Sequence, residues 1–326
     1  MDFGNLFSRA WNICWNNKFL FILGFLAALG SGSASTNSSP QFNYTFSGDE
    51  LPPGWEQNME RFFEGFVAIG IPLLITLSCL LVFLGIILWL VRLSSQAGLI
   101  SAASRLDAGA SVGFGEAFRN GIGYLGRMVG VNLLMFGPLV LVGLIAAGIG
   151  FTSFFTVVAT SVGSGTSPQP EQILGGFGLL ALCFCLLACI LVPVYLIIAV
   201  IYPFAQRGIV LGDLGVVDSI RHGWNVVKEN AGEVLLLILF FFVLGILSGI
   251  VTALVMLPLG FLAFGPAVID MITGSGPAPS DIVFIILGGV VMLLVNAVIN
   301  TLLITYRSVT VTLAYEEFVG KEKAMI

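Results

Sequence analysis

Six runs of apolar residues divide this chain and constrain its fold more than any other feature. They cover approximately residues 17–33, 66–91, 129–156, 174–204, 234–263 and 282–305. The last five exceed the roughly 20 residues that a helix needs to cross a bilayer. Lipid offers no hydrogen-bond partners to the backbone, and the runs lack the alternating pattern of barrel strands. The sequence therefore predicts an all-α membrane protein with six transmembrane helices.

The composition agrees with this prediction. Hydrophobic residues make up 57% of the chain and charged residues only 10%, whereas a soluble domain carries roughly 25% charged residues. Such a chain has too few polar groups to cover a soluble surface, so a water-soluble globular fold is excluded.

The positive charges fall almost entirely on one side of the predicted spans. Only Arg61 lies in a link that the alternation places outside. The other twelve lysines and arginines lie in the tails and in the second and fourth links: Arg9, Lys18, Arg92, Arg105, Arg119, Arg127, Arg207, Arg221, Lys228, Arg307, Lys321 and Lys323. Lysine and arginine accumulate in cytoplasmic loops. We therefore expect a multi-pass protein of the cell membrane with both termini in the cytoplasm.

The first apolar run has a second interpretation. The stretch "KFLFILGFLAALGSGSAS" (Lys18 to Ser35) has a basic flank, a short apolar core and small residues after it, which is also the pattern of a cleavable signal peptide. The same residues also fit a short transmembrane span that is rich in small residues and packs closely against neighbouring helices. The sequence favours the span and leaves cleavage open.

A phrase of aromatic and basic residues recurs before three of the runs, as "FSRAWNICWNNK", "GEAFRNGIGYLGR" and "SIRHGWNVVKEN". Aligning Trp11, Phe118 and Trp224 gives separations close to one third of the chain. We interpret the chain as one transmembrane domain, 1–326, built from three repeats at 1–98, 99–208 and 209–326. Each repeat starts on the same side, so the predicted fold is three parallel hairpins.

Each repeated phrase is expected to form an amphipathic helix. In the third repeat Val217, Ile220, Trp224 and Val227 fall on one side and the polar residues on the other. In the first repeat Phe3, Phe7, Trp11 and Cys14 form the apolar side. Such a helix should lie in the cytoplasmic interface with Trp11, Phe118 or Trp224 at headgroup depth. A helix that caps the bundle and buries the aromatic ring is the alternative.

Residues that would carry catalysis or bind a metal are scarce. His222 is the only histidine, which leaves catalytic triads and zinc sites without the histidines they need. The phrase "RHG" around His222 matches a phosphatase signature too short to carry an argument. The five cysteines lie in or beside apolar runs, where cysteine packs as a small hydrophobe. We expect no enzymatic activity, cofactor, metal or nucleic-acid partner.

The strongest polar groups inside the spans are Asn132, Asn296 and Asn300. Asn296 and Asn300 are four residues apart and therefore share one helix face. Hydrogen bonding between helices is the favoured role for these amides. A polar path for a substrate is the alternative.

The stretches Tyr202–Leu237 and Phe7–Leu29 resemble a broad group of uncharacterised bacterial polytopic membrane proteins. They are also similar to the membrane domain attached to some glycerophosphoryl diester phosphodiesterases. The resemblance covers most of the chain loosely, through the aromatic and basic phrase before each hairpin. These 326 residues include no phosphodiesterase barrel, so no catalytic residue is carried over. The resemblance implies a membrane location and lipid-related work.

The sequence favours an accessory or scaffold protein of a bacterial inner membrane, with membrane lipids and a partner membrane protein as its contacts. A permease or carrier for a lipid or weakly polar substrate is the alternative. A carrier would need a polar cavity that converges on Asn132, Asn296 or Asn300. An accessory protein would show a tightly packed axis.

Overall fold

The computed structural model describes residues 2–29, 71–163, 170–273 and 279–324, and within these ranges every regular element is a helix. Five helices are long: α4 (Ile71–Asp107), α6 (Leu125–Gly163), α7 (Pro170–Gly212), α9 (Ala231–Thr273) and α10 (Pro279–Ala324). Each contains a segment long and apolar enough to cross a membrane. The all-helical class is confirmed, and these five helices mark the chain as a membrane protein.

The first predicted span differs from the other five. Helix α1 (Phe3–Asn16) and helix α2 (Phe19–Leu29) are bent by 96° at the break between them. Helix α2 has 11 residues, and at 1.5 Å per residue it covers only about half of a hydrocarbon core. The described part of the run at 17–33 is therefore too short to span by itself, and its end lies outside the described residues.

The long helices extend beyond the apolar runs at their polar ends. Helix α4 continues to Asp107 although its run ends near residue 91, and α7 continues to Gly212 although its run ends near residue 204. A helix satisfies its own backbone hydrogen bonds, so it needs no lipid to continue. Hydropathy therefore marks the apolar part of each helix and not its end.

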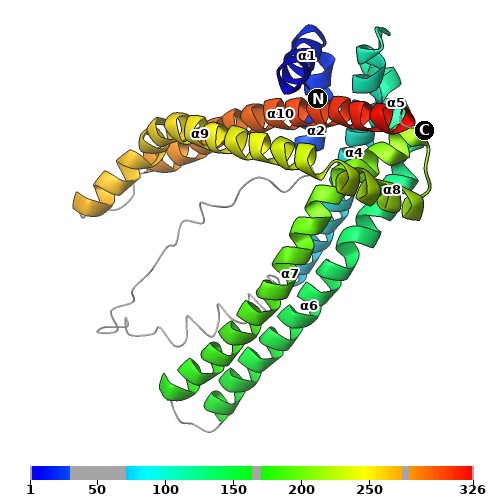
Figure 1. Cartoon of the computed structure of the whole chain (residues 1–326). Helices are drawn as coiled ribbons and strands as arrows, with labels where there is room; N and C mark the ends of the chain where they lie inside the picture. Colours follow the sequence, from blue (N-terminus) through cyan, green and yellow to red (C-terminus); the bar gives the residue numbers. More distant parts are fainter. Residues whose placement is uncertain (1, 30–70, 164–169, 274–278, 325–326) are drawn as a thin grey trace.

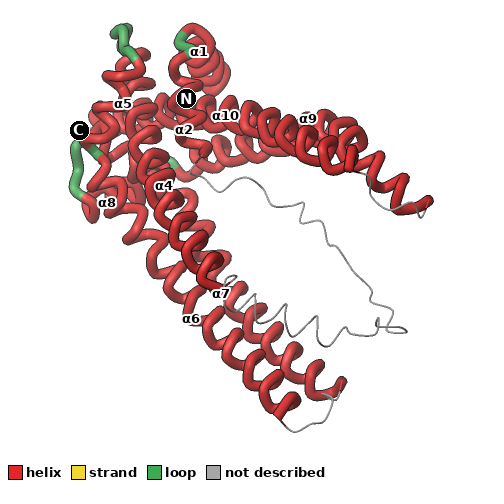
Figure 2. The backbone as a smooth tube through the Cα atoms, turned by 180° about the vertical axis from the view of Figure 1, so that it is seen from behind, coloured by secondary structure: helices red, strands yellow, loops and turns green. Residues whose placement is uncertain are grey.

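The long helices leave a common junction in two directions (Figure 1). Helices α6 and α7 form one antiparallel pair, and α9 and α10 form a second pair that diverges from it. Helix α4 runs beside α6 and α7 (Figure 2). The start of α1 and the end of α10 both lie at the junction, together with the short helices α5 (Phe114–Gly123) and α8 (Val216–Glu229).

The short helices pack in a cyclic order. Helix α5 packs on α4 and α8 packs on α7, so each lies on the long helix that precedes it in the chain. Helix α1 has no described predecessor, and it packs on α10, the last long helix. Each of the three short helices thus packs mainly on one long helix, and the three long helices are different.

Glycines allow two of these helices to dock closely. A Cβ on Gly121 of α5 would overlap the backbone carbonyl of Ser94 on α4. A Cβ on Gly223 of α8 would lie 2.9 Å from the backbone nitrogen of Ala205 on α7. These backbones approach each other without side chains between them, as helices with small residues at the interface do.

The docked faces differ from the apolar faces that the sequence predicts. Helix α8 buries Ser219, Gly223 and Val226, while Val217 and Trp224 are exposed. A stripe of small residues is what permits close backbone contact, and the predicted aromatic stripe cannot do so. Val217 and Trp224 are therefore left on the surface, whereas Ile220 and Val227 are partly buried against the core.

Helix α1 docks in the same way. It buries Leu6, Ala10 and Cys14 against the junction, and Trp11 is exposed. Of the predicted stripe on this helix, only Cys14 is fully buried.

Helix α2 lies in the centre of the junction. Leu20 and Leu23 are fully buried, and a Cβ on Gly24 would overlap the side chain of Thr305 on α10. Helix α2 packs on both α4 and α10. Its described residues fill the space between the long helices and contribute to their common core.

Candidate functional site

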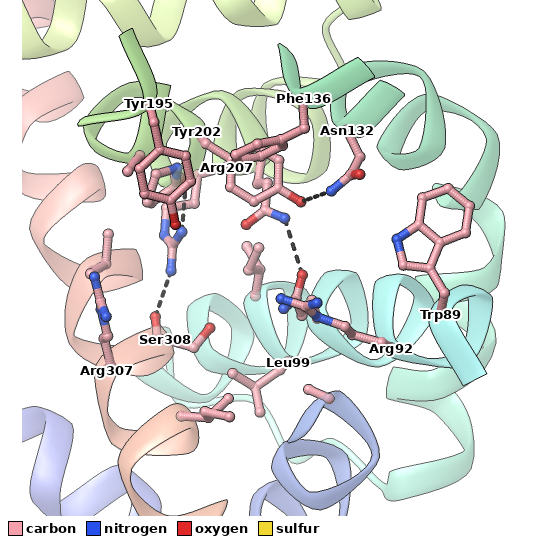
Figure 3. Close-up of a pocket in the computed structure, with 18 residues that line it drawn as sticks. Trp89, Arg92, Leu99, Asn132, Phe136, Tyr195, Tyr202, Arg207, Arg307 and Ser308 are labelled. Atoms are coloured by element: carbon pink, nitrogen blue, oxygen red, sulfur yellow. Dashed lines mark hydrogen bonds between the residues drawn. The ribbon is translucent and has the colours of Figure 1, made fainter. Parts of the chain in front are cut away.

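A polar pocket lies where α4, α6, α7 and α10 meet (Figure 3). Its volume is about 590 Å³, within the range of pockets that hold small molecules. The side chains that line it are Ala27, Trp89, Arg92, Gln96, Leu99, Ile100, Asn132, Phe136, Tyr195, Ala199, Tyr202, Pro203, Gln206, Arg207, Ile304, Arg307, Ser308 and Val311. The pocket therefore combines cationic, amide and aromatic groups within helices that are otherwise apolar.

Three arginines from three different long helices line the pocket. Arg92 comes from α4, Arg207 from α7 and Arg307 from α10. Each lies on the part of its helix that approaches the junction, where the apolar run has ended or is about to end. The convergence of α4, α7 and α10 is what brings the three guanidinium groups to one cavity.

Arg207 is the most buried of the three, with 3% of its surface exposed. Its guanidinium donates hydrogen bonds to the backbone carbonyls of Pro203, at 2.6 Å, and Ser308, at 2.8 Å. Among the described residues its Nε atom has no acceptor. Arg207 therefore links α7 to α10 through carbonyl oxygens, and its charge is only partly compensated.

Arg307 is held differently. Its guanidinium carbon lies 5.2 Å from the centre of the Phe241 ring on α9, a distance at which a cation is attracted by the aromatic face. The side chain is exposed and lines the pocket beside Ser308. In Figure 3, Arg307 and Arg207 lie toward one side of the cavity and Arg92 toward the other.

Amides and tyrosines connect the helices around the pocket. Gln206 of α7 donates to the side-chain oxygen of Gln96 on α4 at 3.2 Å. Asn132 of α6 donates to the hydroxyl of Tyr202 on α7 at 2.9 Å, and the Tyr202 ring meets Phe136 edge to face. These contacts fix the walls of the pocket from three helices.

The charge of the pocket is positive. None of the described side chains that line it is Asp, Glu or Lys. In the part of the chain that the structure describes, no carboxylate pairs with Arg207 or Arg307. Arginine keeps its charge in proteins, so the three guanidinium groups give the cavity a positive charge that attracts anions.

The structure brings only one of the three intramembrane asparagines to the pocket. Asn132 lines it, whereas Asn296 and Asn300 lie elsewhere on α10. The Asn300 amide donates to the side-chain oxygen of Asn296 at 2.8 Å and to its backbone carbonyl at 2.9 Å. Those hydrogen bonds stay within one helix, and the interhelical bond expected of such residues is made by Asn132.

The three candidate interface aromatics occupy different surroundings. Trp11 and Trp224 expose 55% and 48% of their surface. Trp11 stacks on Trp15, whereas Phe118 stacks on Phe114 and packs against the core. The two tryptophans are therefore free to meet lipid headgroups and Phe118 is less so.

His222 makes a contact between helices. Its Nε2 atom lies 2.9 Å from the hydroxyl of Tyr315 on α10. No group of three or more His, Cys, Asp and Glu side chains that could hold a metal occurs among the described residues.

Sequence reasoning missed the arginines as site residues. In the count of positive charges, Arg92, Arg207 and Arg307 appear only as loop and tail charges that indicate the orientation of the chain in the membrane. One signal was available: Gln96 and Gln206 occur in the related phrases "QAGLI" and "QRGIV" at the ends of two spans. Both glutamines line the pocket, so these repeated phrases mark its position.

The sequence model of a Family of unknown function (DUF7544) matches residues 15–315, and the chain belongs to this family. The expectation of an uncharacterised family that covers most of the chain is thereby confirmed. A search of curated proteins and a search of solved structures found no match. These comparisons provide no evidence for similarity to the membrane domain of glycerophosphoryl diester phosphodiesterases.

Proposed function

For this member of a family of unknown function, we propose a six-span membrane protein of three parallel hairpins with both termini in the cytoplasm. Three similar contacts support the repeat: α1 on α10, α5 on α4 and α8 on α7. The division of lysine and arginine, twelve to one, supports the orientation. In this arrangement α1 and α2 begin the first hairpin, and the whole chain forms one domain.

The function that the geometry supports best is the binding of a lipid-like, amphipathic ligand in the pocket. The observation that carries this proposal is a polar cavity of about 590 Å³ that Asn132 lines. A carrier or lipid-handling protein needs such a cavity, whereas a simple scaffold needs a packed axis. The aromatic side chains Trp89, Phe136 and Tyr195 supply apolar contact beside the polar groups. The lipid-related alternative is therefore favoured over a purely structural role.

This proposal includes no chemical reaction. No catalytic residue or cofactor is assigned, and the contacts proposed are with membrane lipid and with a partner membrane protein.

The proposal is tested by asking whether bound lipid depends on the pocket. The protein is extracted with its surrounding bilayer, transferred to mild detergent, and its retained lipid is measured by native mass spectrometry. Ala199→Trp fills the pocket, because Ala199 lines it. Leu196→Trp is the control, since Leu196 lies on the same helix and is exposed.

The proposal predicts that retained lipid falls in Ala199→Trp and stays at the wild-type level in Leu196→Trp. Equal retention in all three proteins would reject the pocket as a ligand site. If a partner protein then co-purified in defined stoichiometry, the scaffold role would replace lipid binding.

A further inference from the structure

We propose that the pocket binds a phosphate group, with Arg92, Arg207 and Arg307 as its ligands. This inference rests on the proposed function and names the headgroup of the ligand. The three guanidinium groups come from α4, α7 and α10, so the site exists only where the three long helices meet.

The burial of Arg207 is the first argument for an anion. A buried cation is costly unless it is paired and fully hydrogen-bonded. Arg207 is almost completely buried, it bonds two backbone carbonyls, and no described carboxylate pairs with it. An anion in the pocket would offset the remaining cost.

The second argument is the repulsion between the cations that share the cavity. Arg207 and Arg307 line the same pocket, and none of the described side chains that line it is a carboxylate. Like charges repel each other, and the buried position of Arg207 weakens the screening by water. A protein that gained only packing from these positions would be served better by apolar residues of similar size. Their presence together therefore points to a negatively charged ligand.

The number of cations favours a phosphate group over a carboxylate. A phosphomonoester carries about −1.5 to −2 charge near pH 7 and has three strong acceptor oxygens. A carboxylate carries one charge and two oxygens. Arginine also forms paired hydrogen bonds to phosphate in a fixed planar geometry. Three arginines on opposite sides of one cavity match the larger charge and the wider set of acceptors.

A lipid headgroup and a free phosphate share this chemistry. The aromatic residues Trp89 and Phe136 beside the arginines fit the glycerol and upper chains of a lipid. The apolar helices that leave the junction would surround the rest of the chains. A soluble phosphate would use only the arginines, so an experiment can separate the two sources.

The test uses the full-length protein, purified and stripped of lipid in detergent, and three probes. The probes are a short-chain phosphatidic acid, a diacylglycerol with the same chains, and inorganic phosphate. Affinity is measured for wild type, Arg307→Gln and Arg307→Lys, because Arg307 is exposed and its replacement leaves the core intact. Arg221→Gln is the control, since Arg221 is exposed and is not among the residues that line the pocket.

We expect phosphatidic acid to bind at least about tenfold more tightly than diacylglycerol, the size of one charge-assisted hydrogen bond. Arg307→Gln should lose about tenfold in affinity for phosphatidic acid, Arg307→Lys should lose less, and Arg221→Gln should match wild type. Diacylglycerol binding should not respond to any of these changes.

Three results would overturn the inference or its premise in distinguishable ways. Equal affinity for phosphatidic acid and diacylglycerol would remove the phosphate site and leave lipid binding intact. Tight binding of inorganic phosphate, with no gain from the chains, would keep the anion site and reject the lipid. The absence of binding by every probe would reject both.

Discussion

The guanidinium of Arg207 on α7 donates a hydrogen bond of 2.8 Å to the backbone carbonyl of Ser308 on α10. This contact joins α7 to α10 beside the pocket. The acceptor is a carbonyl that also accepts from Thr312, so it supplies little of the negative charge that a buried guanidinium requires. The anion proposed for the pocket would supply the charge that these carbonyls do not.

The first prediction concerns the stability of the lipid-free protein when Arg207 is replaced. Arg207→Met removes a buried, partly compensated charge, so the free energy of unfolding should stay unchanged or rise by up to about 4 kcal/mol. Added phosphatidic acid should stabilise wild type and not the variant. Thermal unfolding in detergent measures both effects, with Arg221→Gln as control. A loss of several kcal/mol in the lipid-free variant would show that Arg207 is structural.

The second prediction concerns the docking of α5 on α4. Gly121→Ala places a methyl group against the Ser94 carbonyl and should cost about 1–3 kcal/mol through overpacking. Gly123→Ala, two positions away with open space around it, should be neutral or gain up to about 1 kcal/mol from helix propensity. Unfolding of the two variants by denaturant compares them directly. Equal effects would mean that α5 does not dock through Gly121.

The third prediction separates Trp224 as a surface aromatic from Trp224 as a buried cap. Because the ring is about half exposed, Trp224→Ala should change the unfolding free energy in detergent by less than about 1 kcal/mol. Emptying a buried aromatic site would cost about 3–5 kcal/mol. In bilayers, brominated lipids should quench the fluorescence of a variant that keeps Trp224 alone. Strong destabilisation without quenching would support the cap.

The fourth prediction compares the asparagines. The Asn132–Tyr202 pair joins two helices, so a double-mutant cycle of Asn132→Leu and Tyr202→Phe should give a coupling energy of about 0.6 kcal/mol, and at most about 1.7. Asn296 and Asn300 bond within α10, and replacing both by Leu should cost less than the Asn132 change. The reverse order of the two effects would place the important amide contact on α10.

The fifth prediction concerns pH. Burial in α1 raises the pKa of the Cys14 thiol to about 12. Only the thiolate reacts with alkylating agents, so in a variant that keeps Cys14 alone, labelling at pH 8 should be slow and should increase as the pH approaches 12. Unfolding in detergent should restore rapid labelling at pH 8. Rapid labelling of the folded protein would show that α1 leaves the junction.

The sequence was sufficient to predict the helical class, the membrane location and the positions of five long helices. Long apolar runs determine these features locally, because a helix in lipid satisfies its own backbone. Helix ends such as Asp107 and Gly212 were not predicted, since a helix continues where hydropathy falls. The bend between Asn16 and Phe19 depends on how α1 and α2 pack against α4 and α10.

The site was predicted only in part. Asn132 was recognised because a polar group inside an apolar run is unusual. Arg92, Arg207 and Arg307 were counted as charges of one side, because their role depends on three helices that converge from distant parts of the chain. The docked face of α8, which consists of Ser219, Gly223 and Val226, was not identified, since the sequence left open whether the aromatic stripe faces the headgroups or the bundle. Helices that dock closely need small residues at the contact, and the periodicity of apolar residues does not show where those contacts lie.

Mapping the sides of the membrane tests the proposed arrangement of three parallel hairpins most directly. In a cysteine-free background, single cysteines at Asp2, Ala110 and Asp218 and at Thr45, Gly165 and Ser275 are exposed to an impermeant maleimide on intact cells. The account predicts that the cysteines at Thr45, Gly165 and Ser275 are labelled on intact cells. The cysteines at Asp2, Ala110 and Asp218 should be labelled only after the membrane is opened. Labelling of the cysteine at Ala110 on intact cells would contradict it. Protection of the cysteine at Thr45 on intact cells would also contradict it, because Thr45 would then lie on the same side as Asp218.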